Sequence, residues 1–260
     1  MKRHKALPMH KAHTNGNDFI LLEDLSIDRT SLAQRIAHRK FGIGCDQVIF
    51  YNLNSDQTAS CTFYNQDGSE AGLCLNGVYA LASHLFQKTQ KSWKIATEHH
   101  QFSMRKTESD NLFLDFGTDI VDAIRPLTLA ALQATIAPDT AYCVSVGNHH
   151  LVIPTTHVNK YPLSTLAETV AEQNHFPDGI NISIFEETKG IITMRTHERG
   201  AGLTLGCGSA ALSVFMLMHK HKGTKEATIK QPGGTVTLHI DGQRISMHAN
   251  YQTVASVTLC

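Results

Sequence analysis

The feature that most constrains this chain of 260 residues is an internal repeat. Three short blocks of the first half return in the second half, in the same order and at a nearly constant offset. They are residues 16–22 and 147–153, 44–50 and 179–185, and 71–73 and 201–203. One such echo arises easily by chance, but the shared order of all three indicates a duplication. The chain is therefore expected to fold as two similar halves.

Secondary-structure patterns agree with two similar halves. Runs rich in β-branched and aromatic residues predict strands, and few segments have the apolar spacing of a helix. Strands are expected at 20–23, 47–53, 58–65, 93–97, 101–106, 111–116, 142–146, 150–155, 181–187, 190–196, 226–230, 234–240, 243–248 and 253–259. Helices are expected at 31–39, 74–88, 163–174 and 207–221. This pattern is typical of an α+β fold with mostly antiparallel strands rather than of a doubly wound sheet.

The repeat and the turn signals together predict the domain limits. The junction is expected near 117–127, so that residues 1–120 form the first half and residues 121–250 form the second. The strand within 251–260 follows the complete second half, and we expect it to pair back into the first. Asp241-Gly242 lies between two alternating segments and is expected to form a two-residue hairpin turn.

Composition excludes several classes of protein. With 42% hydrophobic residues the chain can bury a core, and its 23 basic and 23 acidic residues argue against nucleic-acid or anionic-membrane partners. Neither an apolar run long enough to span a membrane nor a signal peptide is recognised. The six cysteines have no CxxC spacing and the 16 histidines have no metal-ligand spacing. A cytoplasmic protein without a metal site is the natural interpretation.

Two cysteines carry the chemistry that the repeat predicts. Cys74 and Cys207 each stand at the start of an expected helix, at matching positions of the two halves. The helix dipole and the unpaired backbone N–H groups there stabilise a thiolate and can also receive a carboxylate. Inversion of a carbon centre needs a base on one face and an acid on the other, which a duplicated cysteine supplies. The alternative is that both are ordinary buried apolar residues.

Six sequence blocks carry a resemblance to a known family. They are TNGNDFILLE (14–23), GIGCDQ (42–47), FYNQDGSEAGLCLNG (63–77), VSVGNHHLVI (144–153), FPDGINISIF (176–185) and RTHERGAGLTLGCGSAA (195–211). As a set they resemble diaminopimelate epimerase, the cofactor-independent amino-acid epimerase of lysine and peptidoglycan synthesis. The resemblance implies two pseudo-symmetric domains, each with strands wrapped around a central helix, and a substrate cleft between them.

The resemblance also implies roles for particular residues. Cys74 and Cys207 would be the base and the acid, with His150 assisting Cys74, Glu198 assisting Cys207 and Glu70 as a further polar neighbour. The α-carboxylate would bind at the two helix starts, and a distal amino-acid centre would bind to Arg199 and several asparagines. The expected substrate-binding residues are Asn17, Gln47, Asn65, Asn76, Gly77, Asn148, Asn181, Arg199, Gly208 and Ser209.

The chain departs from the family pattern at four places. Leu75, His149 and Ala210 replace a glycine, a proline and a glycine, and Val78-Tyr79 stand where an arginine is expected. Leu75 matters most, because a side chain there could crowd the anion site and would be strained at positive φ.

These departures keep other functions open. The leading hypothesis is an epimerase that interconverts LL- and meso-diaminopimelate by two-thiol proton transfer, with no cofactor and no metal. A diverged racemase of another amino acid and a non-catalytic amino-acid binder are the alternatives. The partner is a small amino acid in each case, and a homodimer is compatible with the sequence.

Overall fold

The computed structural model describes residues 7–24, 28–54, 57–127, 140–173 and 176–259 of the chain. The chain divides into two compact units, which we call unit 1, Met1–Phe116 with His248–Cys260, and unit 2, Gly117–Met247. Strands and helices are mixed in both units, which confirms the predicted α+β class.

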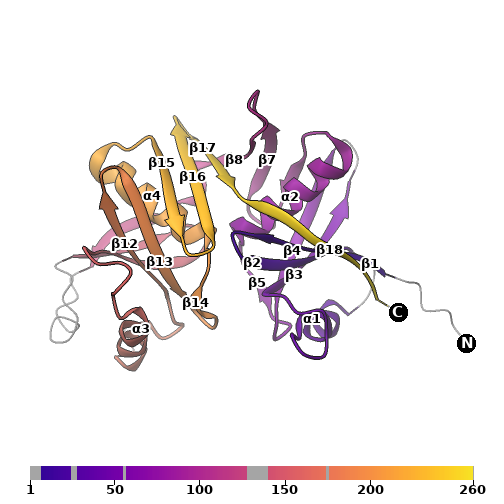
Figure 1. The fold of residues 1–260 in the computed structure, drawn as a ribbon, viewed down its shortest axis with the longest axis horizontal. Helices are drawn as coiled ribbons and strands as arrows, with labels where there is room; N and C mark the ends of the chain where they lie inside the picture. Colours follow the sequence, from indigo (N-terminus) through magenta and orange to yellow (C-terminus); the bar gives the residue numbers. More distant parts are fainter. Residues whose placement is uncertain (1–6, 25–27, 55–56, 128–139, 174–175, 260) are drawn as a thin grey trace, which may run out of the picture. The chain divides into compact units, whose positions relative to one another are not determined.

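Unit 1 has two long helices and a ladder of mostly antiparallel strands (Figure 1). Its elements are β1 (Leu7–Thr14), β2 (Asn17–Glu23), α1 (Arg29–Ala37), β3 (Gln47–Leu53), β4 (Thr58–Asn65), β5 (Glu70–Ala71), α2 (Leu75–Thr89), β6 (Lys94–Ala96), β7 (Gln101–Lys106), β8 (Leu112–Gly117) and β18 (Tyr251–Leu259).

Unit 2 begins with a short 3-10 turn and one additional strand, and from its second strand onward it repeats the order of helices and strands with which unit 1 begins. Its elements are η1 (Thr118–Ile120), β9 (Ala123–Leu127), β10 (Ala141–Ser145), β11 (His149–Pro154), α3 (Leu163–Glu172), β12 (Asn181–Thr188), β13 (Ile191–Glu198), β14 (Gly202–Thr204), α4 (Gly208–Lys222), β15 (Glu226–Gln231), β16 (Gly234–Asp241) and β17 (Arg244–Ala249).

Strand pairing shows that the repeat is structural. In unit 1, β2 runs parallel to β3 after the crossover helix α1, with Phe19 opposite Gln47. In unit 2, β11 runs parallel to β12 after the crossover helix α3, with His150 opposite Asn181. Antiparallel partners then follow in both units, β4 on β3 and β13 on β12. The two halves are therefore built on one plan, as the sequence echoes predicted.

The core of each unit surrounds one helix. Every residue of α2 from Leu75 to Phe86 is buried, and so is every residue of α4 from Gly208 to Met218. A helix with no exposed face has strands around it rather than on one side. The helix α2 contacts β1, β2, β6, β7 and β18. The helix α4 contacts β10, β11, β12 and β16. The outer helices α1 and α3 bury one face only, as at Leu166 and Val170 of α3.

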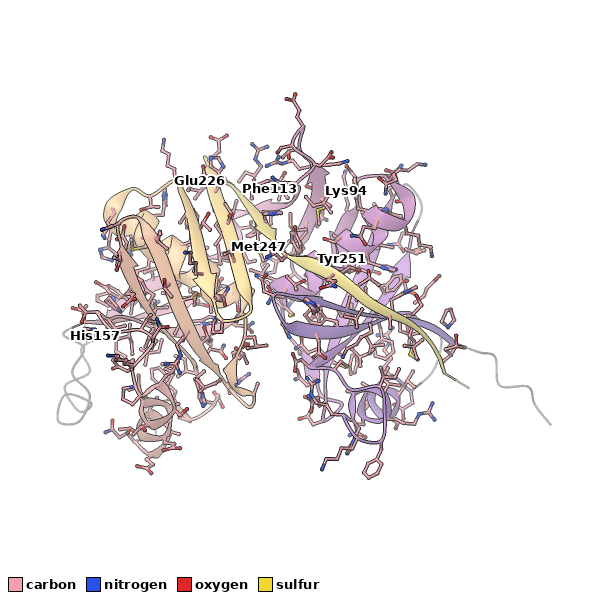
Figure 2. The ribbon with its side chains drawn as sticks, in the orientation of Figure 1. Lys94, Phe113, His157, Glu226, Met247 and Tyr251 are labelled. Carbon is pink, nitrogen blue, oxygen red and sulfur yellow. The ribbon has the colours of Figure 1, made fainter. Side chains whose placement is uncertain are left out.

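The C-terminal strand completes unit 1. β18 begins at Tyr251 (Figure 2) and pairs antiparallel with β1, from Tyr251 opposite Thr14 to Leu259 opposite Leu7. In unit 2 the strand at the matching place is β9, which pairs antiparallel with β10. The matching strands β1 and β10 are therefore each covered by a strand that lies outside the repeated order, β18 on β1 and β9 on β10.

Candidate functional site

Cys74 is the N-cap residue of α2. Its backbone is extended, with φ −121° and ψ 98°, and its Sγ accepts a hydrogen bond from the Gly77 N–H at 3.4 Å. Cysteine thus takes the capping position that serine or aspartate usually holds. A capped sulfur receives negative-charge stabilisation from the first helical turn. The structure therefore places the Cys74 sulfur at the N–H end of the first turn of α2.

Three predicted substrate residues lie around Cys74 in unit 1. The Oδ1 of Asn17 lies 3.9 Å from the Cys74 Sγ. The same oxygen accepts a hydrogen bond from the Nδ2 of Asn76 at 3.4 Å. Gly77 supplies the capping N–H, and a Cβ in its place would lie 2.7 Å from Phe63 Cε1. Only glycine fits there without displacing the aromatic ring.

Gln47 and Asn65 form a second predicted pair in unit 1. They stand opposite each other on β3 and β4, and Gln47 Nε2 donates to Asn65 Oδ1 at 3.0 Å. Asn65 in turn donates to Ser69 Oγ at 3.1 Å. The amides of both residues are thus held in one orientation at the ends of these strands.

Glu70 lies in β5. Its carboxylate accepts a hydrogen bond from Tyr64 Oη at 3.4 Å, and it lines a pocket of unit 1 together with Arg29 and Cys61. Its predicted role beside the cysteine stays a prediction.

Cys207 is the N-cap residue of α4, in nearly the same backbone conformation as Cys74, with φ −129° and ψ 117°. It is buried, and Gln231 Oε1 accepts its backbone N–H at 2.7 Å. Gln231 ends β15, directly before the Pro232-Gly233-Gly234 turn. It was not predicted, because nothing in the sequence distinguishes a glutamine that fixes a loop from one on the surface.

The Cys207 thiol lies beside the Glu198 carboxylate. Burial raises its pKa well above the usual value, and the Glu198 carboxylate, hydrogen-bonded to the thiol, raises it further. Glu198 also accepts a hydrogen bond from Thr204 Oγ1 at 2.6 Å. Cys207 is therefore held as a thiol in this structure, next to a carboxylate that can take its proton.

Ser209 joins Cys207 to His150 within unit 2. Its Oγ lies 3.4 Å from Cys207 Sγ and 3.0 Å from His150 Nε2. Burial, with a smaller contribution from His149, lowers the pKa of His150 to about 3, so the imidazole is neutral. The structure brings His150 to the cysteine of its own unit through a hydroxyl; the pairing with Cys74 stays a prediction.

The predicted distal-binding residues of unit 2 lie close together. Asn181 Oδ1 accepts the Arg199 backbone N–H at 3.0 Å, and its Nδ2 donates to the His149 carbonyl at 3.1 Å. The Arg199 guanidinium donates to the Asp178 carbonyl at 2.8 Å and passes over Gly179, whose Cβ position lies 2.8 Å from Arg199 Cδ. Asn148 accepts the Val146 N–H through its carbonyl in the turn before β11.

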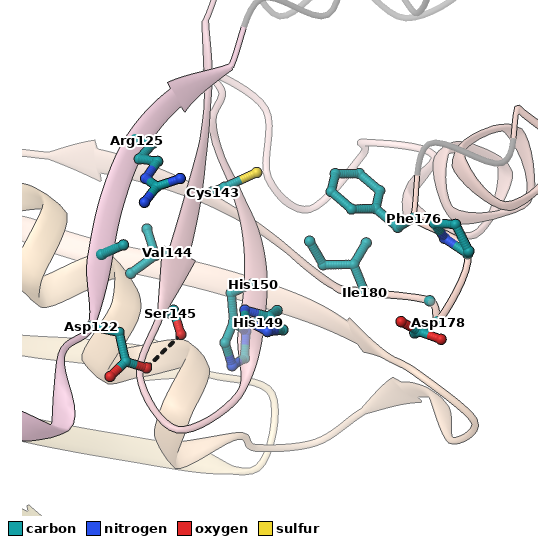
Figure 3. Close-up of a pocket in the computed structure, with 13 residues that line it drawn as sticks. Asp122, Arg125, Cys143, Val144, Ser145, His149, His150, Phe176, Asp178 and Ile180 are labelled. Carbon is teal, nitrogen blue, oxygen red and sulfur yellow. Dashed lines mark hydrogen bonds between the residues drawn. The ribbon is translucent and has the colours of Figure 1, made fainter.

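A pocket of about 570 Å³ lies beside this group in unit 2 (Figure 3). His149 and His150 line it from β11, Arg125 from β9, and Phe176 and Asp178 from the loop before β12. Ser145 Oγ donates to Asp122 Oδ2 at 2.8 Å across its lower end. His149 therefore adds an imidazole to a cavity that adjoins the predicted site residues.

The described part of the chain shows neither a metal cluster nor a membrane-spanning helix. Within it, no group of three or more histidine, cysteine, aspartate or glutamate side chains could hold a metal ion. Within it, too, no helix is long and apolar enough to cross a membrane.

Comparison with known proteins identifies the family. The profile of the diaminopimelate epimerase family matches residues 9–109 and 142–254, which cover both cysteine-capped helices. The chain belongs to the diaminopimelate epimerase family. Two family relatives are the diaminopimelate epimerases of Rickettsia massiliae, 31% identical with 88% of this chain and 86% of that protein covered, and of Clostridium perfringens, 27% identical with 95% and 97% covered.

Solved structures show that the family fold is shared widely. A protein of the PhzF phenazine-biosynthesis family from Enterococcus faecalis has a TM-score of 0.75 at 14% identity, with 98% of this chain and 100% of that chain covered. A hydroxyproline epimerase from Agrobacterium vitis has a TM-score of 0.70 at 11% identity, with 100% and 94% covered. At these identities the likeness concerns the fold alone.

Leu75, the main departure from the diaminopimelate epimerase pattern, is accommodated without strain. It is the first residue of α2, and it is not among the non-glycine residues of the described chain that have positive φ. Its side chain is 1% exposed, so it is packed into the core of unit 1. The condition for strain, a positive φ at Leu75, is therefore not met, and crowding of the anion site by Leu75 stays a prediction.

The burial of Leu75 predicts that its side chain contributes to the stability of the protein. Leu75→Gly, which restores the family residue, should lower the free energy of unfolding by about 3 kcal/mol, because it empties a filled core site. Urea unfolding measures the loss. Leu205→Gly is the matched control, since Leu205 is 54% exposed and should cost less than about 1 kcal/mol. Equal losses in the two variants would contradict the packing of Leu75.

Proposed function

We propose that this protein is a diaminopimelate epimerase that interconverts the LL and meso isomers by proton transfer at one α-carbon. The observation that carries the proposal is the pair of matching N-cap cysteines, Cys74 on α2 and Cys207 on α4, in a chain of this family. Inversion requires one group to remove the α-proton and another to return a proton from the opposite face. A duplicated unit provides two equivalent thiols for these two tasks.

The neighbours of each sulfur support alternating acid and base roles. Cys207 has the Glu198 carboxylate to take its proton when it must act as a base. Cys74 has the N–H of Gly77 to stabilise its thiolate. We place His150 beside Cys207 through Ser209, and its role toward Cys74 follows the family resemblance only.

Recognition of the substrate follows from the groups at the two helix starts. By the family resemblance, the α-carboxylate binds to first-turn amides such as those of Asn76, Gly208 and Ser209, whereas the Gly77 N–H is occupied by the Cys74 sulfur in this structure. The Arg199 guanidinium can bind the distal carboxylate through two parallel hydrogen bonds. The side-chain oxygens of Asn181 and Asn148 can accept hydrogen bonds from the distal ammonium. Asn17, Gln47 and Asn65 would line the pocket on the side of Cys74.

The proposed setting is lysine and peptidoglycan precursor synthesis in the cytoplasm, with a free amino acid as the substrate. The thiol pair performs both proton transfers, so the reaction needs neither pyridoxal phosphate nor a metal ion. Dialysis of the protein against a chelator should therefore leave the rate unchanged.

Proton NMR in heavy water tests the proposal. The reduced protein with LL-diaminopimelate should replace the α-proton by deuterium while the meso isomer appears. Isomerisation with exchange supports the proposal. Absence of exchange on diaminopimelate, with exchange on another amino acid, would indicate a diverged racemase; binding by calorimetry without exchange on any amino acid would indicate a binding protein.

A further inference from the structure

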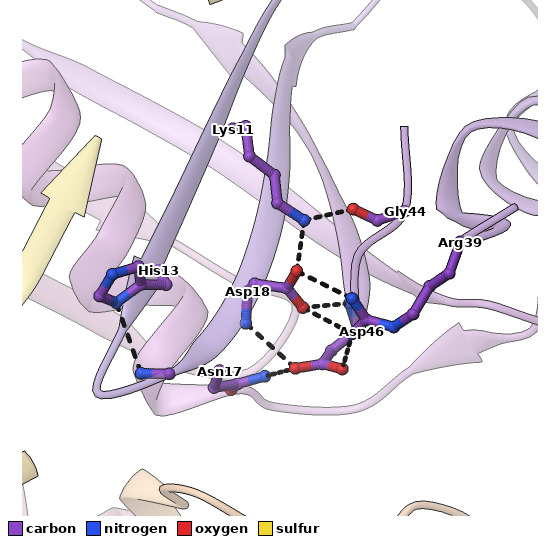
Figure 4. Close-up of polar contacts among 8 residues, drawn as sticks. Lys11, His13, Asn17, Asp18, Arg39, Gly44 and Asp46 are labelled. Atoms are coloured by element: carbon purple, nitrogen blue, oxygen red, sulfur yellow. Dashed lines mark hydrogen bonds and ion pairs between the residues drawn. The ribbon is translucent and has the colours of Figure 1, made fainter. Parts of the chain in front are cut away.

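Two aspartates and two cations form a compact cluster at the start of β2 (Figure 4). Arg39 donates to Asp18 Oδ1 at 2.9 Å and to Asp46 Oδ1 at 2.6 Å. Lys11 donates to Asp18 Oδ2 and to the Gly44 carbonyl. The two aspartates are also joined through the backbone, because Asp46 N donates to Asp18 Oδ1 at 2.8 Å and Asp18 N donates to Asp46 Oδ2 at 3.0 Å. Each carboxylate is thus held by groups from several segments.

Asp46 reaches from this cluster to Asn17. Its Oδ2 accepts the Asn17 Nδ2 at 3.0 Å. A side-chain amide has a donating end and an accepting end, so fixing the nitrogen also fixes the oxygen. The Asn17 Oδ1 accordingly points away from Asp46, toward Cys74 Sγ at 3.9 Å and Asn76 Nδ2 at 3.4 Å.

Asp18, which helps to hold Asp46, stays charged over the range in which an enzyme works. Burial alone would raise the pKa of Asp18, but hydrogen bonds from Arg39 and Lys11 lower it to about 2. Asp46 faces the same guanidinium at 2.6 Å. Asp18 is therefore an acceptor only. Both oxygens of Asp46 are occupied as acceptors by geometry, Oδ1 by Arg39 and Oδ2 by the Asp18 N–H and the Asn17 Nδ2.

We propose that Asp46, held by Arg39 and Asp18, is a positioning residue that sets the Asn17 amide with its oxygen toward the Cys74 sulfur. Cys74 then has a hydrogen-bond acceptor, Asn17 Oδ1, for its S–H and a donor, the Gly77 N–H, for its thiolate. A residue that gives up and regains a proton in each cycle needs both partners. The inference rests on the proposed function, in which Cys74 is one of the two proton-transfer groups.

The test is the pH dependence of Cys74 alkylation by iodoacetamide in the substrate-free protein, followed by peptide mass spectrometry. In Asp46→Ala the Asn17 oxygen is no longer held toward the Cys74 S–H, and loss of this acceptor should destabilise the thiol form. The pH at the midpoint of Cys74 alkylation should therefore fall by about 0.5 to 1 pH unit, which corresponds to the free energy of one hydrogen bond. Asn17→Leu should give the same fall while the charged cluster stays intact. The double variant should fall no further than either single one.

Asp24→Ala is the matched control. Asp24 also pairs with an arginine, Arg29, directly after β2 rather than at its start. Its removal should leave the alkylation midpoint of Cys74 unchanged. The neighbouring thiol of Cys61 does not interfere, because burial and the nearby Cys74 raise its pKa to about 12.

Three results would overturn the inference: no shift in Asp46→Ala, an equal shift in Asp24→Ala, or a shift in Asp46→Ala that Asn17→Leu does not share. The last would mean that the lost charge, not the amide, changed the sulfur. Because the measurement needs no substrate, its failure is separate from a failure of the proposed epimerase activity, which the NMR experiment decides.

Discussion

Cys74→Ser and Cys207→Ser should each lower the rate of isomerisation of diaminopimelate by about a thousandfold. A hydroxyl is a far weaker acid than a thiol, so it neither removes the α-proton nor gives one back at useful rates, and acid–base catalysis of this kind contributes roughly that factor. Each variant keeps one thiol. Each should therefore retain slow exchange on only one of the two isomers, and the favoured isomer should differ between the variants.

Initial rates of α-proton exchange and of isomerisation, measured separately for the LL and meso isomers, check this result. Cys143→Ser is the matched control, because Cys143 is partly exposed like Cys74 but lies in the middle of β10, away from a helix start. It should keep nearly full activity. Full activity in either Cys74→Ser or Cys207→Ser would contradict the two-thiol mechanism.

Acid should destabilise the folded protein well before its carboxylates titrate. Burial lowers the pKa of His150 to about 3, and burial with smaller effects of His10 and Lys88 lowers the pKa of His84 to about 4. In the unfolded chain both take up a proton near pH 6.5, so the unfolded state binds more protons below that pH. When the pH falls from 7 to 5, the free energy of unfolding should therefore decrease by about 2 kcal/mol for each of the two histidines.

Urea unfolding at pH 7 and at pH 5 measures this loss. His84→Gln should reduce the difference between the two pH values by about 2 kcal/mol, because it removes one buried titrating group. His99→Gln is the control, since His99 is on the surface with 75% of its side chain exposed, and it should leave the difference unchanged. A stability that is flat from pH 7 to pH 5 would show that neither ring is buried in its neutral form.

Most elements of the fold could be predicted because their apolar pattern is local. The strands predicted at 47–53, 58–65 and 101–106 have the limits of β3, β4 and β7. β1 was missed, since its sequence LPMHKAHT contains a proline, two histidines and a lysine and resembles a surface segment. Its place between β2 and β18 comes from pairing with segments distant in the sequence, which a local pattern does not contain.

The candidate site shows the same limit. Both cysteines could be placed at helix starts, and the structure finds each of them as an N-cap. Asp46 and Gln231 could not be found, because each acts on another residue, Asn17 or the backbone of Cys207. The backbone conformation at Leu75 could not be predicted for a related reason: the negative φ and the core space at this position are set by the packing of the unit.

The pairing of β18 with β1 also determines how the chain could be rewired. Leu7 and Leu259 are strand partners, and unit 1 is made of two segments that meet at this edge. A circular permutant that joins the two ends with a short linker and opens between Phe116 and Gly117 would encode unit 2 and then unit 1, each as one uninterrupted stretch. The chain would then pass between the units once instead of twice. The new ends would lie in the last residue pair of β8, and the remaining connection would run through β17.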